Sequence, residues 1–346
     1  MTEAAVAEEA MPMTATRRTV LAGAAAAIAA PAVAEGPMQD ALDYVQGQRT
    51  TGFLMVRNRQ VLVERNWPLG ADAGKFRDDF TYGTTAGGAL LEDVASQQKS
   101  FVAVLAAIAA DKGLLDVEKP VSAYIGPGWS KAAPGQEAAI RVLHLLTMSS
   151  GLSTEFAYAA PPGTTFLYNT PVYAVTKAVL AAAAKAPLEA ITRDWLTAPA
   201  GMADTAWRPR PASFGDVGNP TGLVTSPRDV ARFGQLILDG GVAEGGRRVV
   251  SAAALKALFA RSPANPAYGR LWWLNGSDYA IRPLARRTDG PLIPAAPADL
   301  VAALGALDRK LYVVPSLGAV VVRMGQAAPD HDFDQQLWLR LSRALA

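Results

Sequence analysis

The chain has 346 residues, half of them hydrophobic, and a net charge of +2 from 33 basic and 31 acidic side chains. This length suits one large or two ordinary globular domains, and without any lysine or arginine run longer than a pair the sequence lacks the electrostatic footprint of a nucleic-acid-binding protein. The absence of cysteine excludes disulfides, thiolate metal sites and a cysteine nucleophile. With only two histidines, any chemistry falls to Ser, Thr, Tyr, Lys, Arg and carboxylates.

The N-terminal segment has the pattern of an export signal. The pair Arg17-Arg18 precedes an alanine-rich apolar run, Val20 to Ala30, which is followed by the small residues of Pro31 to Ala34. Paired arginines before a mildly hydrophobic run are typical of bacterial twin-arginine leaders, and the run is shorter than the roughly 20 residues that span a bilayer. We therefore expect residues 1–34 to be a signal peptide, rather than merely a helical N-terminus. We expect residues 35–346 to work in the periplasm or outside the cell, without a membrane span.

Two hairpins are predicted near opposite ends of this domain. Apolar runs on either side of Asn58-Arg59 predict one hairpin over residues 53–65. Two further apolar runs, 311–314 and 319–323, predict a second. We expect the two hairpins to share one antiparallel sheet.

Helical periodicity predicts the remaining elements. Apolar residues recur at helical spacing, with glycine after several of the runs, over residues 100–112, 171–184, 228–239, 252–260 and 333–345. The predicted fold class is α/β of the α+β kind: an antiparallel sheet formed by the N- and C-terminal segments and flanked by helices, with an inserted, mostly helical domain at roughly 114–260.

A serine and a lysine three residues apart form the candidate catalytic motif. Ser96-Gln97-Gln98-Lys99 stands at the start of the apolar helix FVAVLAAIAA. Residues three apart share a helix face, and burial there would lower the pKa of Lys99, so that its neutral amine accepts the Ser96 proton. The helix N-terminus would stabilise an oxyanion beside the serine. The alternative is that Ser96 is an ordinary N-cap and Lys99 a solvated residue of the first turn.

Several longer segments of the sequence, taken in order, match the pattern of a known protein family. They are KGLLDVEKPVSAYI, IRVLHLLTMSSGL, PPGTTFLYNTPVYAV, NPTGLVTSPRDVARFGQLILDGG, NPAYGRLWWLNG and LYVVPSLGAVVVRMG. Together with SQQKSF they resemble the serine β-lactamase and penicillin-binding-protein superfamily, specifically its class C-like branch. The resemblance covers most of residues 35–346. It implies the β-lactamase/transpeptidase fold and an acyl-enzyme formed on Ser96.

The resemblance assigns a second set of residues. Tyr168 matches the family's catalytic tyrosine, which passes the serine proton to the leaving group and later activates water. A phenol beside a lysine ammonium can exist partly as phenolate. The family usually has Tyr-x-Asn, whereas here Asn169 and Thr170 follow the tyrosine. The substrate-binding role of that asparagine is left open between these two residues.

The family's third motif, Lys-Thr-Gly, is missing. By position its best match is Leu304-Gly305-Ala306. The resemblance implies that Gly305 borders the substrate and that the N–H groups of Ala306 and Ser96 form the oxyanion hole, at about 3 kcal/mol per donor. The cation that would bind a substrate carboxylate is lost unless Arg309, Lys310 or Arg323 replaces it. This loss favours an ester or small amide over a β-lactam.

Other residues invite functional assignments that their surroundings do not favour. His144 lies in the apolar run LHLLTM and is expected to be structural. His331 stands among three aspartates, a spacing that fits the solvated first turn of the last helix better than a metal site. The tryptophans at 207, 272 and 273 can line a cleft or fill the core.

These observations predict an exported serine hydrolase without metal or cofactor. Its substrate is expected to be a small ester, amide or lactam, with Ser96 as nucleophile and Lys99 and Tyr168 as acid and base. The branch also contains β-lactamases and D-Ala peptidases, so those activities are alternatives. A third alternative is a binding or sensor protein that is acylated once, or that binds cell-wall fragments, without turnover.

Overall fold

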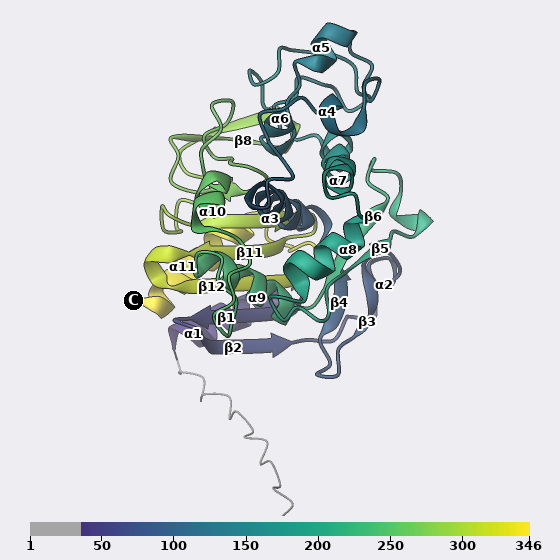
Figure 1. Cartoon of the computed structure of the whole chain (residues 1–346). Helices are drawn as coiled ribbons and strands as arrows, with labels where there is room; N and C mark the ends of the chain where they lie inside the picture. The colour runs from purple at the N-terminus through teal and green to yellow at the C-terminus, as the bar shows by residue number, and fades with distance from the viewer. Residues whose placement is uncertain (1–35) are drawn as a thin grey trace, which may run out of the picture. The chain divides into compact units, whose positions relative to one another are not determined.

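The computed structural model describes residues 36–346, so the predicted signal peptide lies outside the described residues. A six-stranded antiparallel sheet runs through the centre in the order β2-β1-β12-β11-β10-β7 (Figure 1). Its strands are β1 (Thr50–Arg57), β2 (Gln60–Asn66), β7 (Trp273–Leu274), β10 (Val301–Gly305), β11 (Arg309–Val314) and β12 (Ala319–Gly325). No helix within residues 36–346 is long and apolar enough to cross a membrane.

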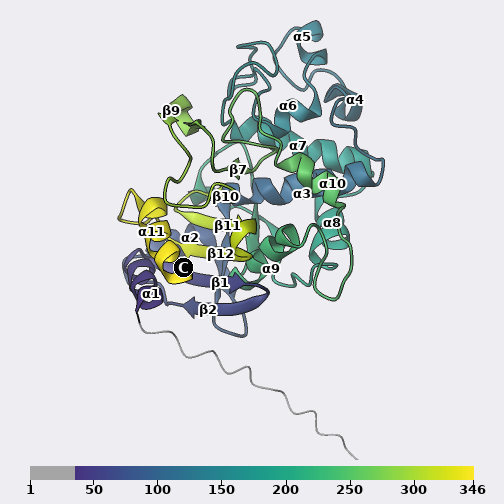
Figure 2. The ribbon, with the colours of Figure 1, turned by 90° about the vertical axis from the view of Figure 1, so that its left-hand side faces the viewer.

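The two predicted hairpins meet in this sheet. β1 pairs antiparallel with β12, so that Leu54 lies opposite Val322 and Met55 opposite Val321. Both strands are buried along nearly their whole length because helices cover both faces of the sheet. Figure 2 shows α1 (Pro37–Gly47) and α11 (Phe333–Leu345) on one face and α9 (Pro227–Leu238) on the other. The prediction of one sheet built from both ends is confirmed.

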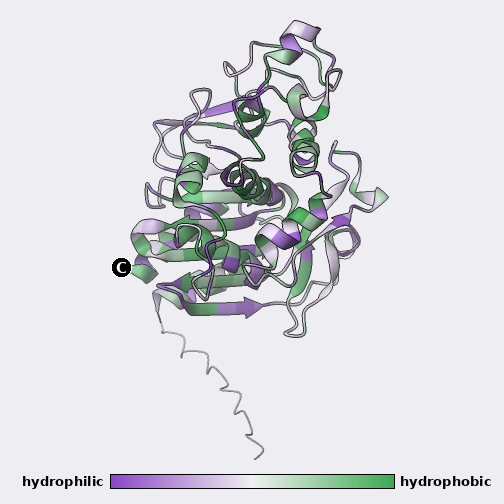
Figure 3. Ribbon diagram, viewed as in Figure 1, coloured by the Kyte–Doolittle hydropathy of each residue, from purple (hydrophilic) through white to green (hydrophobic). Residues whose placement is uncertain are grey.

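The central helix α3 (Gln98–Asp111) is almost entirely buried and contains Lys99, one of the two residues of the candidate motif. Every residue from Gln98 to Ala109 is buried, and hydrophobic colouring follows the helix in Figure 3. The sequence placed its start at residue 100; the helix begins two residues earlier because a 3₁₀ turn, η1 (Ala95–Gln97), leads directly into it. Gly113, with a φ of 69°, follows the end of α3 in the left-handed conformation that favours glycine.

Smaller sheets frame the candidate site. A four-stranded sheet in the order β3-β4-β6-β5 leads through β4 into η1, and the hairpin β8-β9 stands apart from it. Their short, partly polar strands give no clear period-two pattern, so the sequence did not predict them. Their bounds are β3 (Thr81–Thr84), β4 (Leu90–Asp93), β5 (Ala206–Pro209), β6 (Thr221–Thr225), β8 (Tyr279–Arg282) and β9 (Arg286–Asp289).

The segment expected as a helical insertion contributes to more than one layer. Its strands β5 and β6 join the four-stranded sheet, and its helix α9 packs on the central sheet so closely that a Cβ on Gly234 would lie 2.5 Å from Val320 Cγ1. The remaining helices are α2 (Gly74–Phe80), α4 (Ser122–Ile125), α5 (Pro134–Ala138), α6 (Val142–Leu146), α7 (Thr170–Ala184), α8 (Leu188–Thr192) and α10 (Ala252–Leu258). A short π-helix, η2 (Arg193–Thr197), and the 3₁₀ turns η3 (Ala212–Phe214), η4 (Pro283–Ala285) and η5 (Pro315–Leu317) complete the elements.

Candidate active site

Ser96 and Lys99 meet where β4 turns into α3. Ser96 lies in η1 and Lys99 in the first turn of α3. Lys99 Nζ is 2.8 Å from Ser96 Oγ, which is hydrogen-bond distance. Only 2% of Lys99 is exposed. The lysine is therefore not the solvated residue that the alternative interpretation requires.

The surroundings of Lys99 favour a neutral amine. Burial is the main cause that holds the pKa of Lys99 well below its usual value, and the positive charges of Arg210 and Lys177 lower it further. The rings of Tyr168 and Tyr173 each have their centroid 4.8 Å from Nζ. A neutral amine in contact with a hydroxyl group can accept its proton.

Tyr168 stands beside the same pair as a neutral phenol. Burial raises the pKa of Tyr168 to about 12, although its interaction with the Ser96 side chain lowers the pKa in part. The expected partial phenolate in the resting protein is therefore corrected. Burial disfavours both the ammonium and the phenolate, so the surroundings of the pair favour a neutral amine and a neutral phenol.

Residues from three of the predicted segments line one pocket of about 250 Å³. It is lined by Ser96, Tyr168, Trp273, Arg282, Pro283, Leu292, Leu304, Gly305 and Ala306. The nucleophile motif, the tyrosine and the position of the missing third motif, which are far apart in the sequence, therefore border one space.

Gly305 lets the end of β10 lie close to η1, the turn that contains Ser96. A Cβ at this position would lie 2.3 Å from the carbonyl oxygen of Val94 and 3.3 Å from the backbone nitrogen of Gln97. No side chain larger than hydrogen fits there without moving the strand. This close approach brings Ala306 to the Ser96 pocket, where the sequence predicted its N–H as an oxyanion donor.

Two buried arginines hold the turn that follows. Arg309 Nη1 donates to the carbonyl of Ala306 at 3.0 Å, and Arg323 Nη1 donates to the carbonyls of Leu307 and Asp308 at 2.9 and 3.1 Å. Leu307 and Asp308 both have positive φ, near 60°, which is unfavourable for leucine. The guanidinium groups therefore stabilise a strained turn next to the predicted oxyanion donor.

The two residues after Tyr168 have different environments. Asn169 caps α7: its side-chain oxygen accepts from Val172 N, and its side-chain nitrogen donates to the carbonyls of Leu152 and Ser153. Both N–H groups and the oxygen of its amide are bound to the backbone, and only 2% of the residue is exposed, so Asn169 does not present its amide to a substrate. Thr170 Oγ1 instead lies 3.2 Å from Lys99 Nζ. Of the two candidates left open by the sequence, only Thr170 contacts the catalytic candidates.

Comparison with known proteins agrees with this geometry. A family model described as Beta-lactamase matches residues 32–345. The chain belongs to the beta-lactamase family. A search of curated protein sequences gives no match.

Solved structures share the family fold at low sequence identity. A beta-lactamase/D-alanine carboxypeptidase from Yersinia pestis is 18% identical, covers 89% of this chain and 98% of its own, and gives a TM-score of 0.66. A class C beta-lactamase mutant is 16% identical, covers 89% and 97%, and gives 0.65. A Bacillus anthracis protein named for 6-aminohexanoate-dimer hydrolysis is 17% identical, covers 88% and 81%, and gives 0.64. These likenesses show the β-lactamase/transpeptidase fold.

The three cations considered as replacements for the missing third-motif lysine lie outside the Ser96 pocket. Arg309 and Arg323 are fully buried in holding the β10–β11 turn, and Lys310 pairs with Asp334 at 2.9 Å. None of the three lines the Ser96 pocket, so the expectation that one of them replaces the cation is corrected. Arg282, from β8, does line it. The arginine-rich stretch 282–287 was the available sequence signal, but its distance from any motif concealed it.

A buried ion pair next to Ser96 was also missed by the sequence analysis. Asp93 Oδ1 accepts a hydrogen bond from the backbone N–H of Ala95 at 2.7 Å, and both of its oxygens bind Arg210, at 2.7 and 3.2 Å. Ala95 has a φ of 49°, an uncommon conformation for alanine. The ion pair therefore holds the strained residue that orients Ser96.

His144 has a structural position, and the neighbouring tryptophans Trp272 and Trp273 lie in the core and in the pocket, respectively. His144 Nδ1 accepts from the backbone N–H of Arg141 at the start of α6, a capping contact. Trp272 is fully buried and stacks on Phe233, whereas Trp273 stacks on Tyr168 in the pocket. Within residues 36–346, no group of three or more histidines and carboxylates is arranged to hold a metal ion.

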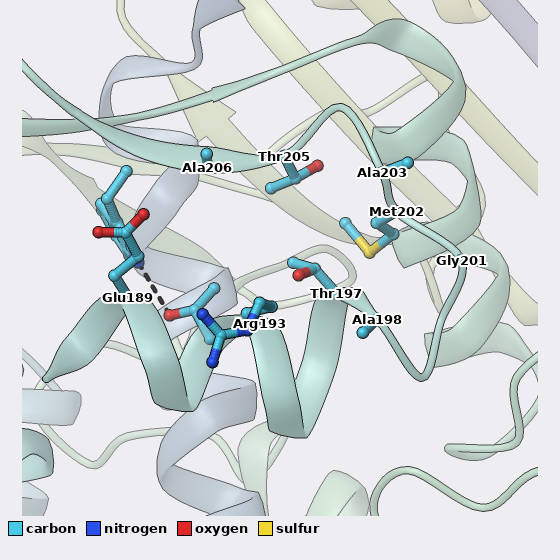
Figure 4. A pocket seen from close by; sticks show the side chains of 11 residues that line it. Glu189, Arg193, Thr197, Ala198, Gly201, Met202, Ala203, Thr205 and Ala206 are labelled. Atoms are coloured by element: carbon cyan, nitrogen blue, oxygen red, sulfur yellow. Dashed lines mark hydrogen bonds between the residues drawn. The ribbon is translucent and has the colours of Figure 1, made fainter. Parts of the chain in front are cut away.

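A second cavity, of about 380 Å³, lies between α8, η2 and β5. Figure 4 shows threonine, alanine and methionine side chains around it, with Glu189 and Arg193 on the helical side. Trp207 borders it and donates from Nε1 to Thr192 Oγ1 at 2.8 Å. None of the predicted site residues lines this cavity, so the smaller pocket at Ser96 is the candidate active site.

Proposed function

We propose that this protein is a serine hydrolase that cleaves a small ester or amide through an acyl-enzyme on Ser96. The observation that carries the proposal is the 2.8 Å contact between Ser96 Oγ and the buried Nζ of Lys99, whose pKa is lowered. Membership of the beta-lactamase family supports it. The name of the Bacillus anthracis protein, which refers to an amide dimer, supports an amide among the substrates.

In the acylation step Ser96 loses a proton, Lys99 accepts it, and Tyr168 donates a proton to the leaving group. Ser96 Oγ attacks the carbonyl carbon while its proton passes to Lys99 Nζ, and the carbonyl oxygen becomes an oxyanion near the N–H groups of Ser96 and Ala306. The bond to the leaving group then breaks as Tyr168 gives that group its phenolic proton. The products of this step are the acyl-enzyme, a released alcohol or amine, and a phenolate beside the new ammonium of Lys99.

Deacylation returns every proton. The Tyr168 phenolate takes a proton from water, and the resulting hydroxide attacks the acyl carbon. When the second tetrahedral intermediate collapses, Lys99 returns its proton to Ser96 Oγ. The phenolate that water activation needs is thus formed during the reaction, although the resting phenol has a raised pKa.

A fluorophosphonate probe followed by intact-mass measurement tests the nucleophile. We expect one adduct per chain, absent in Ser96→Ala and slowed at least a hundredfold in Lys99→Met, because general-base assistance contributes about 10²- to 10⁴-fold. Labelling of Ser96→Ala at the wild-type rate would defeat the assignment. Thr164→Ala, at an exposed hydroxyl outside the pocket, is the matched control and should label normally.

A specific observation also favours a second function, that of a protein that is acylated and then stalls. The raised pKa of Tyr168 makes a weak acid of the group that must protonate the leaving group and a strongly basic phenolate that is costly to form. If that cost dominates, a 4-nitrophenyl ester gives a single stoichiometric burst. Sustained release of 4-nitrophenol that is lost in Tyr168→Phe supports the hydrolase. A single burst without turnover supports the protein that stalls as its acyl-enzyme.

A further inference from the structure

Arg282 places a cation at the wall of the Ser96 pocket. It is the last residue of β8, is half-buried, and donates from Nη2 to the carbonyl of Leu292 at 2.6 Å. This bond uses one of the five N–H groups of its guanidinium. The hydrogen bond fixes the side chain against the pocket wall and leaves other donors available to a ligand.

A second arginine faces it across the hairpin. Arg286, the first residue of β9, is directly opposite Arg282 in the antiparallel register. Like charges in this position destabilise a strand pair. Among residues 36–346, no carboxylate lies within 4.0 Å of the guanidinium group of either residue, although Arg287 next along the chain pairs with Asp289 at 3.5 Å. Asp334 exerts an electrostatic influence on Arg282, but its carboxylate is paired with Lys310 at 2.9 Å. Two facing cations without an ion-pair partner of their own form a site that an external anion would stabilise.

We propose that the Ser96 pocket takes esters or amides that carry a carboxylate, which Arg282 binds while Arg286 adds a second positive charge. This inference rests on the proposed hydrolase function. The planar guanidinium fork matches a carboxylate in two parallel hydrogen bonds, and partial burial strengthens them. The missing Lys-Thr-Gly motif favours an ester or small amide over a β-lactam, and this inference adds a carboxylate to that ester or amide.

Matched pairs of esters test the preference. On the acyl side, 4-nitrophenyl hydrogen glutarate and 4-nitrophenyl pentanoate have chains of equal length and differ in a terminal carboxylate. On the leaving-group side, 5-butanoyloxy-2-nitrobenzoate and 4-nitrophenyl butanoate differ in the same way. The quantity measured is the ratio of kcat/KM for the charged to the neutral ester, so that effects common to both cancel.

The expected result is a loss of preference confined to one arginine. In at least one pair, Arg282→Gln should lower the ratio by about 10- to 100-fold, the usual range for a hydrogen bond to a charged group. Arg282→Lys keeps the charge but not the planar guanidinium fork, so its ratio should lie between those of wild type and Arg282→Gln. Arg287→Gln is the matched control because Arg287 lies 3.9 Å over the Tyr279 ring and pairs with Asp289, and its ratio should equal that of wild type.

The outcomes separate this inference from the proposed function. Equal ratios in wild type and Arg282→Gln, for both pairs, overturn the inference while leaving the hydrolase intact. If Ser96-dependent hydrolysis is absent for all four esters, the proposed function fails, and calorimetric titration of the wild-type protein with glutarate decides the inference. Binding that is lost in Arg282→Gln then supports the carboxylate site, and absent or equal binding overturns it.

Discussion

Replacing Lys99 with methionine should destroy activity and stabilise the fold. Methionine keeps the apolar stem in its buried place but removes the amine that lies 2.8 Å from Ser96 Oγ. The loss of a general base should slow acylation by about 10²- to 10⁴-fold, which corresponds to about 3 to 5 kcal/mol in the barrier.

The gain in stability follows from the sign of the pKa shift. Burial lowers the pKa of Lys99 in the folded protein below its ordinary value of 10.5. Between these two pKa values the unfolded chain binds one proton more than the folded chain, so this lysine makes the free energy of unfolding rise with pH. At pH 7 Lys99 therefore reduces stability, and Lys99→Met should unfold at a higher temperature than wild type. The difference should shrink towards pH 10.5, where the unfolded lysine also loses its proton.

Two measurements on the same samples check this prediction. Fluorophosphonate labelling gives the acylation rate, and thermal melts at pH 7 and pH 10 give the stability, where each kcal/mol raises Tm by about 2 °C in a chain of this size. Lys119→Met, at an exposed lysine, is the control and should change neither. A variant that melts below wild type at pH 7, or that labels at nearly the wild-type rate, would refute the argument for a neutral buried amine.

Three further substitutions test the surroundings of the pocket. Gly305→Ala should lower kcat/KM by at least tenfold, because the new Cβ would lie 2.3 Å from Val94 O and displace β10; wild-type kinetics would contradict the close approach. Arg309→Met should lower kcat by about 10- to 100-fold with little change in KM, since the loosened carbonyl of Ala306 no longer fixes the oxyanion donor; a rise in KM alone would exclude that role. Asn169→Ala should destabilise the fold by about 1 to 2 kcal/mol in urea unfolding yet keep kcat/KM within threefold, and a selective loss of activity would return Asn169 to the site.

The sheet was predictable because its signals are local and strongly apolar. The strands β1 and β12 are continuous apolar runs beside turns, and their burial on both faces removes the need for alternation. The strands β4 and β6 have four and five residues and gain their stability from partners distant in the sequence. Such pairings leave no periodic pattern in the sequence, so the sheet that leads into η1 and Ser96 was not predicted.

The candidate site was predictable where its residues stand in a motif. Spacing and family resemblance selected Ser96, Lys99 and Tyr168, and the structure places Ser96 and Tyr168 along one pocket with Lys99 beside Ser96. Arg282 was not predicted as a pocket residue because it lies in a hairpin that carries no recognisable motif. The protonation state of Tyr168 was not predicted for a different reason. It depends on how deeply the side chain is buried, which a sequence indicates only roughly.

The joining of β1 and β12 sets an order on folding. β1 pairs with β2 directly after it in the sequence, but its other neighbour, β12, comes about 270 residues later. The sheet therefore remains open on that side until the ribosome has released residues 319–325. Pairings between such distant segments carry a large loop-closure cost and form slowly. Until then β1 keeps an unpaired, apolar edge that invites association with other chains. Biogenesis of this protein therefore contains an interval in which chaperone protection matters most, and it closes only when the last hairpin docks.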